Sequence, residues 1–72
     1  MENLREKMRR LAEARVYGNR FGVLEARLDL AAEYVKEGYR EAAEEHLEIV
    51  ASENAYWKSE AEKITGLRSI TG

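Results

Sequence analysis

The sequence predicts an all-α protein, and three observations point to that class. Ala, Glu, Leu, Arg and Lys dominate the 72 residues, and these residue types favour helices. Proline, which interrupts helices, is absent. Apolar residues recur at steps of three and four, which is the spacing of one side of an α-helix. We expect three helices in a single domain over residues 1–66, with a flexible tail at 67–72.

Residues 2–17 are expected to form the first helix, because Leu4, Met8 and Leu11 follow one another at steps of four and three. The start of the chain is also basic. Residues 1–22 hold six basic and three acidic side chains, a net charge of +3, whereas residues 23–53 hold three and nine, a net charge of −6. These segments either neutralise each other on folding, which we favour, or present two charged surfaces to partners.

The segment GNRFG, residues 18–22, decides whether the first helix continues. In one straight helix over residues 2–37, the apolar stripes of the two halves would lie almost opposite each other, because each residue turns the chain by about 100°. We therefore predict a break, with Gly18 as the left-handed residue that ends the first helix and Asn19 as the N-cap of the second. The alternative is a long two-helix hairpin that dimerises.

Residues 20–37 are expected to form the second helix, which Gly38 ends. Its main apolar stripe comprises Tyr17, Phe21, Leu24, Leu28, Ala31 and Val35, and a second apolar side comprises Val23, Leu30 and Tyr34. A wide apolar arc is typical of a helix that touches two neighbours. We therefore expect this helix to lie between the first and the third.

Residues 39–65 are expected to form the third and longest helix, closed by Gly66 and paired antiparallel with the second in a helical hairpin. Its apolar side comprises Ala43, Leu47, Val50, Asn54, Trp57, Ala61 and Ile64. Residues 30–50 are similar to the helix pair of a tetratricopeptide repeat, at Leu30, Tyr34, Gly38, Tyr39 and Ala42. The turn is one residue short, Ala31 replaces the usual glycine and no closing proline follows. The resemblance therefore implies an antiparallel helical hairpin and no family membership.

The predicted length of the third helix indicates a surface for another chain. At about 1.5 Å per residue it would extend past the end of the second helix, with apolar groups that nothing covers. We therefore expect a homo-oligomer, first of all a dimer. The predicted partner or self-association interface comprises Tyr56, Trp57, Ala61, Ile64 and Leu67. The alternative for Trp57 is to close the intramolecular core by packing on Phe21. The absence of cysteine strengthens the expectation, since a chain of this size often needs a supplement to its core and disulfides are excluded.

The residues that carry chemistry point away from an enzyme. His46 is the single histidine, and it has neither a nucleophile–acid pair nor the Glu-x-x-His spacing of a di-iron bundle around it. We expect no catalytic residue, no metal site and no cofactor. We also expect no membrane-spanning segment and no secretory signal, hence a cytoplasmic protein, in the host-cell cytoplasm if the source is viral.

The basic first helix suggests a second function class. Arg5, Arg9, Arg10, Arg15 and Arg20 are candidates for contact with nucleic acid or with an acidic partner. The acidic pI of about 5.4 argues against nucleic acid. The prediction is therefore a small non-enzymatic interaction, adaptor or regulatory protein that acts on a protein partner through helix–helix contacts and self-associates. The alternative is a nucleic-acid-binding regulator.

Overall fold

The computed structural model describes the backbone of residues 2–71 and the side chains of residues 3–64. Over residues 2–71 the chain forms four helices: α1 (Glu2–Tyr17), α2 (Arg20–Glu37), α3 (Arg40–Ala51) and α4 (Ala55–Thr71). The all-α prediction is confirmed. The prediction of three helices is wrong, because the segment 39–65 forms two helices instead of one.

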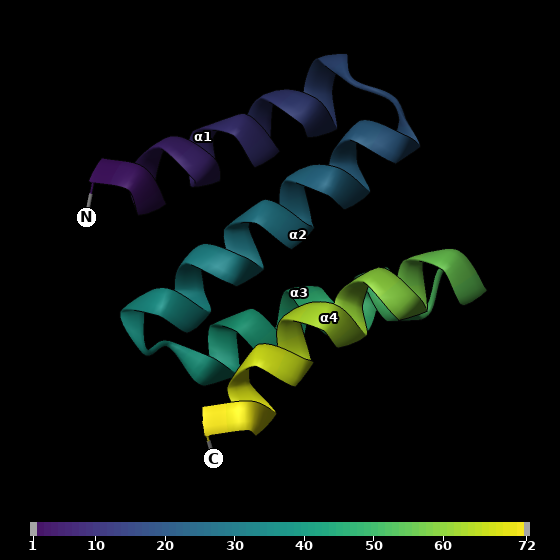
Figure 1. Cartoon of the computed structure of the whole chain (residues 1–72). Helices are drawn as coiled ribbons and strands as arrows, with labels where there is room; N and C mark the ends of the chain where they lie inside the picture. The colour runs from purple at the N-terminus through teal and green to yellow at the C-terminus, as the bar shows by residue number, and fades with distance from the viewer. Residues whose placement is uncertain (1, 72) are drawn as a thin grey trace.

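The helices follow one another in an antiparallel zigzag (Figure 1). Helix α2 lies in the middle, with α1 along one side and α3 along the other, as the two apolar sides of this helix predicted. Helix α4 turns back along α3 and also contacts α2. Among the described residues α1 packs on α2 alone. The result is a plate of 37 by 31 by 14 Å.

The GNRFG segment interrupts the helix, so that α1 and α2 are separate. Both predicted helix ranges are confirmed. Asn19 is the N-cap of α2, since its Oδ1 accepts a hydrogen bond of 2.8 Å from the Gly22 amide. Gly18 does not adopt the predicted left-handed conformation. Its amide donates to the Ala14 carbonyl at 2.8 Å, and a Cβ at this position would lie 2.8 Å from the same oxygen. Glycine is needed at position 18 because the Ala14 backbone lies too close for a Cβ, and not because the residue is left-handed.

Gly38 ends α2 as predicted, with a φ of 89°. The Tyr39 amide donates to the Tyr34 carbonyl at 2.8 Å, and the Gly38 amide donates to the Val35 carbonyl at 3.1 Å. These two bonds satisfy carbonyls at the end of the helix and reverse the chain into α3.

The residues Ser52–Asn54 separate α3 from α4, and this turn is the main correction to the prediction. The Ser52 hydroxyl donates to the Ile49 carbonyl at 2.8 Å, and Asn54 Oδ1 accepts from the Trp57 amide at 3.0 Å. Ser and Asn side chains tend to form such bonds with the backbone instead of continuing a helix. Asn54 is therefore the cap of α4 and not a residue of a continuous apolar side. The segment predicted as one long helix therefore reverses direction at this turn. The predicted extension of that helix past the end of α2 is not formed by the described residues.

Helix α4 also extends beyond its predicted end, since its backbone is helical to Thr71 and passes Gly66. The single domain ending at residue 66 and the flexible tail at 67–72 stay predictions.

The core consists of two apolar clusters on the two sides of α2. One cluster joins α2 to α3 and α4, and the other joins α2 to α1. The first comprises Leu24, Ala31, Ala43, Leu47, Val50, Trp57 and Ala61, and the second Leu4, Leu11 and Leu30. Tyr17, expected at the start of the main stripe of α2, belongs to α1 and is exposed. Helix α2 is thus the element on which all the others assemble.

Two glycines of this frame should respond oppositely to the same substitution. Gly38→Ala should lower the free energy of unfolding by about 1–2 kcal/mol, because a side chain is strained at positive φ even though the surrounding space is open. Gly22→Ala should raise it by up to about 1 kcal/mol, because Gly22 is helical and meets only Asn19 Oδ1, at 3.5 Å. Urea titration of both variants checks this, and equal effects would contradict the conformational account.

The cap at Asn54 makes a second stability prediction. Asn54→Ala should destabilise the protein by about 1 kcal/mol, because the Trp57 amide loses its acceptor. Ser59→Ala is the matched control on the exposed side of the same helix and should change stability by less than about 0.5 kcal/mol. If chemical denaturation gives the two variants the same stability, Asn54 does not cap α4.

Candidate functional site

The candidate site is an apolar groove across α2 at its C-terminal end. Helices α1 and α3 flank α2 without touching each other, so their facing sides leave a hollow with a volume of about 580 Å³. Its lining comprises Leu4 and Met8 of α1, Tyr34 of α2, the turn residues Gly38 and Tyr39, and Arg40, Glu41 and Ala42 of α3. Met8 is 44% exposed and Tyr39 is 47% exposed, so both rims offer apolar surface to solvent.

Helical periodicity extends this apolar surface beyond the groove. Ile49 lies two turns after Ala42 on α3 and therefore shares its side. Val16 follows Met8 on α1 by eight positions, which turns it by about 80° from Met8, to a direction between those of Arg5 and Arg9. Both are exposed, Val16 at 71% and Ile49 at 45%. We call this side of the plate the groove face. It is the uncovered side of the α1–α2–α3 layer.

Helix α4 covers the opposite side of α3. Leu47 and Ala51 of α3 line a separate hollow together with Ala61 of α4, whereas Ala42 and Ile49 lie on another side of α3. Figure 1 shows α4 lying across one side of the plate only. No described residue therefore shields the groove face.

A polar cluster lies on the same side as the groove, between α2 and α3. Arg27 Nη1 lies 3.0 Å from His46 Nδ1, and the imidazole stacks on the Tyr34 ring with centroids 5.9 Å apart. A guanidinium only donates, so Nδ1 is the acceptor and the proton of the neutral ring is on Nε2. The sequence analysis singled out His46 but did not pair it with Arg27, because the two residues are 19 positions apart on different helices.

The surroundings of His46 lower its pKa. Burial is the largest cause, and the positive charge of Arg27 adds to it, while Glu45 acts in the opposite direction. Protonation at Nδ1 would remove the acceptor from Arg27 and place two cations side by side. The cluster is therefore held together by a neutral histidine.

The residues predicted as a self-association interface divide between the core and the surface. Trp57 is 5% exposed and meets the Phe21 ring at a centroid distance of 5.3 Å, so the contact of the alternative interpretation is present. Ala61 is also buried, and Ile64 is partly buried against the same core cluster. Tyr56, on the Trp57 ring at 5.1 Å, remains 58% exposed.

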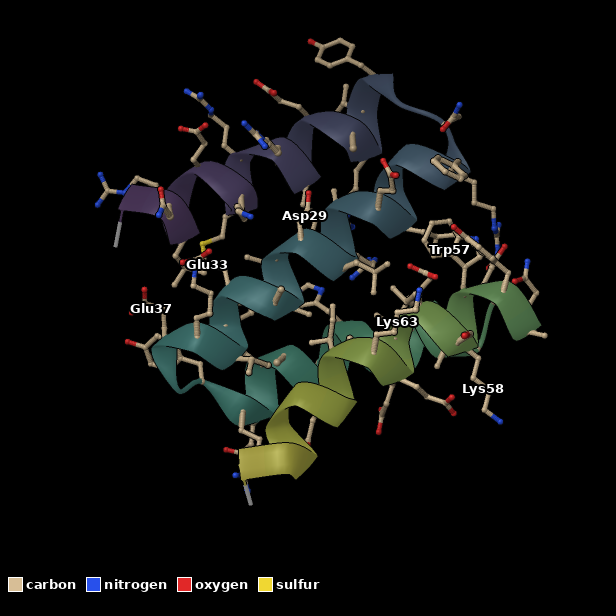
Figure 2. All side chains as sticks on the ribbon, viewed as in Figure 1. Asp29, Glu33, Glu37, Trp57, Lys58 and Lys63 are labelled. Carbon is tan, nitrogen blue, oxygen red and sulfur yellow. The ribbon has the colours of Figure 1, made fainter. Side chains whose placement is uncertain are left out.

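Leu67, the fifth residue of that predicted interface, lies outside the described side chains. Figure 2 shows Trp57 between α4 and the first turn of α2, while Lys58 points away from the core. Buried residues are not available to a partner, so the geometric reason for an interface at Trp57 and Ala61 is removed. Self-association itself stays a prediction.

The five predicted arginines do not gather on one surface. Arg5 and Arg9 are one turn apart on an exposed side of α1, but Arg10 is turned away by about 100° from Arg9 and pairs with Glu6 at 3.2 Å. Arg15 is exposed near the end of α1. Arg20 belongs to α2, where its guanidinium forms two hydrogen bonds with Glu53, one of them 2.6 Å long. These bonds are the main cause that lowers the pKa of Glu53.

Glu33 is a further residue that sequence reasoning did not single out. It is 4% exposed on α2, and Lys36 Nζ lies 3.9 Å from its carboxylate. Figure 2 shows Asp29, Glu33 and Glu37 at successive turns of α2. The folded chain thus buries one acidic side chain of α2.

Among residues 3–64, no three or more His, Asp or Glu side chains are grouped so that they could hold a metal ion. Among the described helices, none combines the length and the hydropathy required to span a bilayer. No family model, curated protein or solved structure matches the chain.

The neutral state of His46 predicts how stability depends on pH. Because its folded pKa is below the ordinary value of about 6.5, the unfolded chain takes up the proton first as the pH falls. Stability should therefore be constant above about pH 6.5 and decrease below it, down to the folded pKa. His46→Gln keeps an acceptor for Arg27 and cannot titrate, so its curve should be flatter between pH 6.5 and about 5.

Two measurements check this. Urea titrations at several pH values compare how the free energy of unfolding of the wild type and of His46→Gln changes with pH. The range from pH 6.5 to about 5 lies above the pH of about 4 at which carboxylates titrate. The NMR signal of the single histidine gives its pKa directly. Parallel curves for the two proteins, or a pKa at or above the ordinary value, would show that His46 is not held neutral.

Proposed function

We propose that this is a small non-enzymatic interaction protein that works through helix–helix contacts made by its groove face, and that it self-associates. The observation that supports the proposal is the apolar groove between α1 and α3, which no described residue covers. A hollow lined by Met8, Tyr34, Tyr39 and Ala42 fits apolar side chains presented by a helix. The function is contact, and the groove face is the contact surface.

The apolar residues of the groove face give this contact a source of free energy. Met8, Tyr39 and Ile49 each leave close to half of their surface exposed, and Val16 leaves more. Covering the remainder of one such side chain is worth on the order of 1 kcal/mol. Several must be covered together to offset the lost freedom of two molecules. A partner that seats along the whole face is therefore favoured over one that fills a single hollow.

The basic character of α1 supports a nucleic-acid role less well. Arg10 and Arg20 are already paired with acidic side chains, and Arg5 and Arg9 share their surface with Met8 and Val16. A strip of cations interrupted by apolar groups suits a protein surface better than a row of phosphates.

Two exposed tyrosines test which surface self-associates. Tyr39→Ser removes a ring from the groove rim and places a favoured capping residue at the start of α3, where Tyr39 makes no side-chain cap bond. We expect its dimer dissociation constant to rise by about tenfold or more. Tyr56→Ser removes a ring of somewhat greater exposure, 58% against 47% for Tyr39, from the surface predicted on α4 and should leave the constant within about twofold.

Light scattering over a hundredfold range of concentration, with sedimentation equilibrium, measures both constants. A wild-type protein that stays monomeric throughout would contradict self-association. A loss confined to Tyr56→Ser would return the contact to α4. Trp57→Ala is not suited to this test, because removing a buried tryptophan costs about 3–5 kcal/mol of stability and would unfold the chain.

A further inference from the structure

We propose that the occupant of the groove face is a second copy of this chain, placed by a two-fold axis parallel to α2, so that the basic α1 of each copy lies over the acidic α3 of the other. This inference rests on the self-association proposed above and specifies its geometry. The occupant is argued from three properties of the face: the placement of its helices, their charges and its area.

The placement of the helices makes such a pairing possible. Helices α1 and α3 lie on opposite sides of α2 and run in the same direction (Figure 1). A two-fold rotation about an axis parallel to α2 exchanges these two sides and keeps the level along α2 unchanged. It therefore brings α1 of one copy over α3 of the other, and α2 over α2. The contact is the same patch on both copies, as in most symmetric dimers.

The level of the residues along α2 sets which ones meet. Leu4 and Met8 line the same hollow as Tyr39 and Ala42, so the first half of α1 is level with the first half of α3. After the rotation, the start of α1 in one copy faces the start of α3 in the other. Each exposed Met8 then approaches the apolar strip that contains Ala42 and, two turns further on, Ile49.

The charges of the two helices are complementary in this arrangement. Helix α1 has five basic and three acidic side chains, net +2, and α3 has one basic and four acidic, net −3. Arg5 and Arg9 border the apolar strip of α1, and Glu41 and Glu45 border that of α3, each pair one turn apart and exposed. None of the four forms an ion pair with a described residue.

The perpendicular two-fold axis would give the opposite result, since it places α1 over α1 and α3 over α3. Cations would then face cations, and Glu41 and Glu45 of each α3 would face the α3 of the other copy. Like charges across an interface disfavour association. The distribution of charge therefore selects the axis parallel to α2.

The size of the face is comparable with that of a standard interface. A plate of 37 by 31 Å presents a side of at most roughly 1,100 Å², and a standard interface needs about 800 Å² from each partner. The polar cluster of Arg27, His46 and Tyr34 lies close to the axis, where it would meet its own copy. This position brings the two Arg27 guanidinium groups near each other, and a neutral His46 avoids adding two more positive charges there.

A charge-exchange experiment tests the pairing. One variant carries Arg5→Glu and Arg9→Glu, and the other carries Glu41→Arg and Glu45→Arg. Each variant alone places like charges together at both α1–α3 contacts of the dimer. Its dissociation constant should therefore rise by about tenfold or more relative to the wild type. In an equimolar mixture both contacts become attractive again, and a mixed dimer of near wild-type affinity should form. Sedimentation measures the three samples, and circular dichroism confirms that each variant is folded.

The outcomes separate this inference from the proposed function. A wild-type dimer that weakens with Tyr39→Ser, with no recovery in the mixture, would overturn the α1-on-α3 pairing and leave the groove-face contact standing. Variants that dimerise as tightly as the wild type would also overturn the pairing. A monomeric wild type would remove self-association and this inference together, and the groove would then serve a different protein.

Cross-linking supplies a second test that tolerates weak folding of the charge variants. The chain has no cysteine, so single substitutions give unambiguous links. A mixture of Arg9→Cys and Glu45→Cys copies should form a disulfide-linked pair on oxidation. Arg9→Cys mixed with Lys58→Cys, an exposed position on α4, should form none above background. Equal yields from the two mixtures would contradict the proposed arrangement.

Discussion

Leu24 and Ala31 are shielded on one side of α2, and Leu30 is shielded on another, so this one helix has to bury two separate apolar sides. The four helices of residues 2–71 include no further layer that encloses α2 completely. The solution is to place α1 against one side and the α3–α4 pair against the other. Each outer helix is held by its contact with α2 or with a helix that touches it. The flat shape follows from this arrangement.

The two ends of α2 are closed in different ways, and the candidate site results from that difference. At the N-terminal end, Phe21 meets Trp57 and Arg20 is hydrogen-bonded to Glu53, so the start of α2 is tied to α4 and to the α3–α4 turn. At the C-terminal end, the turn at Gly38 separates α3 from α1, and no side chain of residues 3–64 fills the space between them. The chain is thus compact at one end of α2 and open at the other.

Helix α4 distinguishes the two sides of the plate. It packs on α3 and α2 from one side, where Trp57 and Ala61 complete the core, and leaves the other side of α3 uncovered. Had the chain continued as one long helix, α3 would have had no cover on either side and Trp57 would have been free for a partner. The three-residue turn at Ser52–Asn54 therefore moves the apolar surface available for contact from the end of the molecule to its groove face.

The sequence alone determined the helical class, the first two helices and the caps at Asn19 and Gly38, because these depend on local periodicity and on residues that act within one turn. It also indicated that α2 has two apolar sides. It did not determine the end of α3. The alternating steps from Ala43 to Ile64 continue unbroken across the turn, since periodicity reports which side of the chain is apolar and not whether the backbone continues.

Only the tertiary structure decided which apolar residues remain exposed and which polar residues meet. Trp57 and Ala61 are buried because α4 reverses direction, and Met8 and Tyr39 are exposed because α1 and α3 lie apart across α2. The pairs Arg27–His46 and Arg20–Glu53 join residues 19 and 33 positions apart. Such contacts depend on how helices are placed in space, and no pattern within a single helix contains that information.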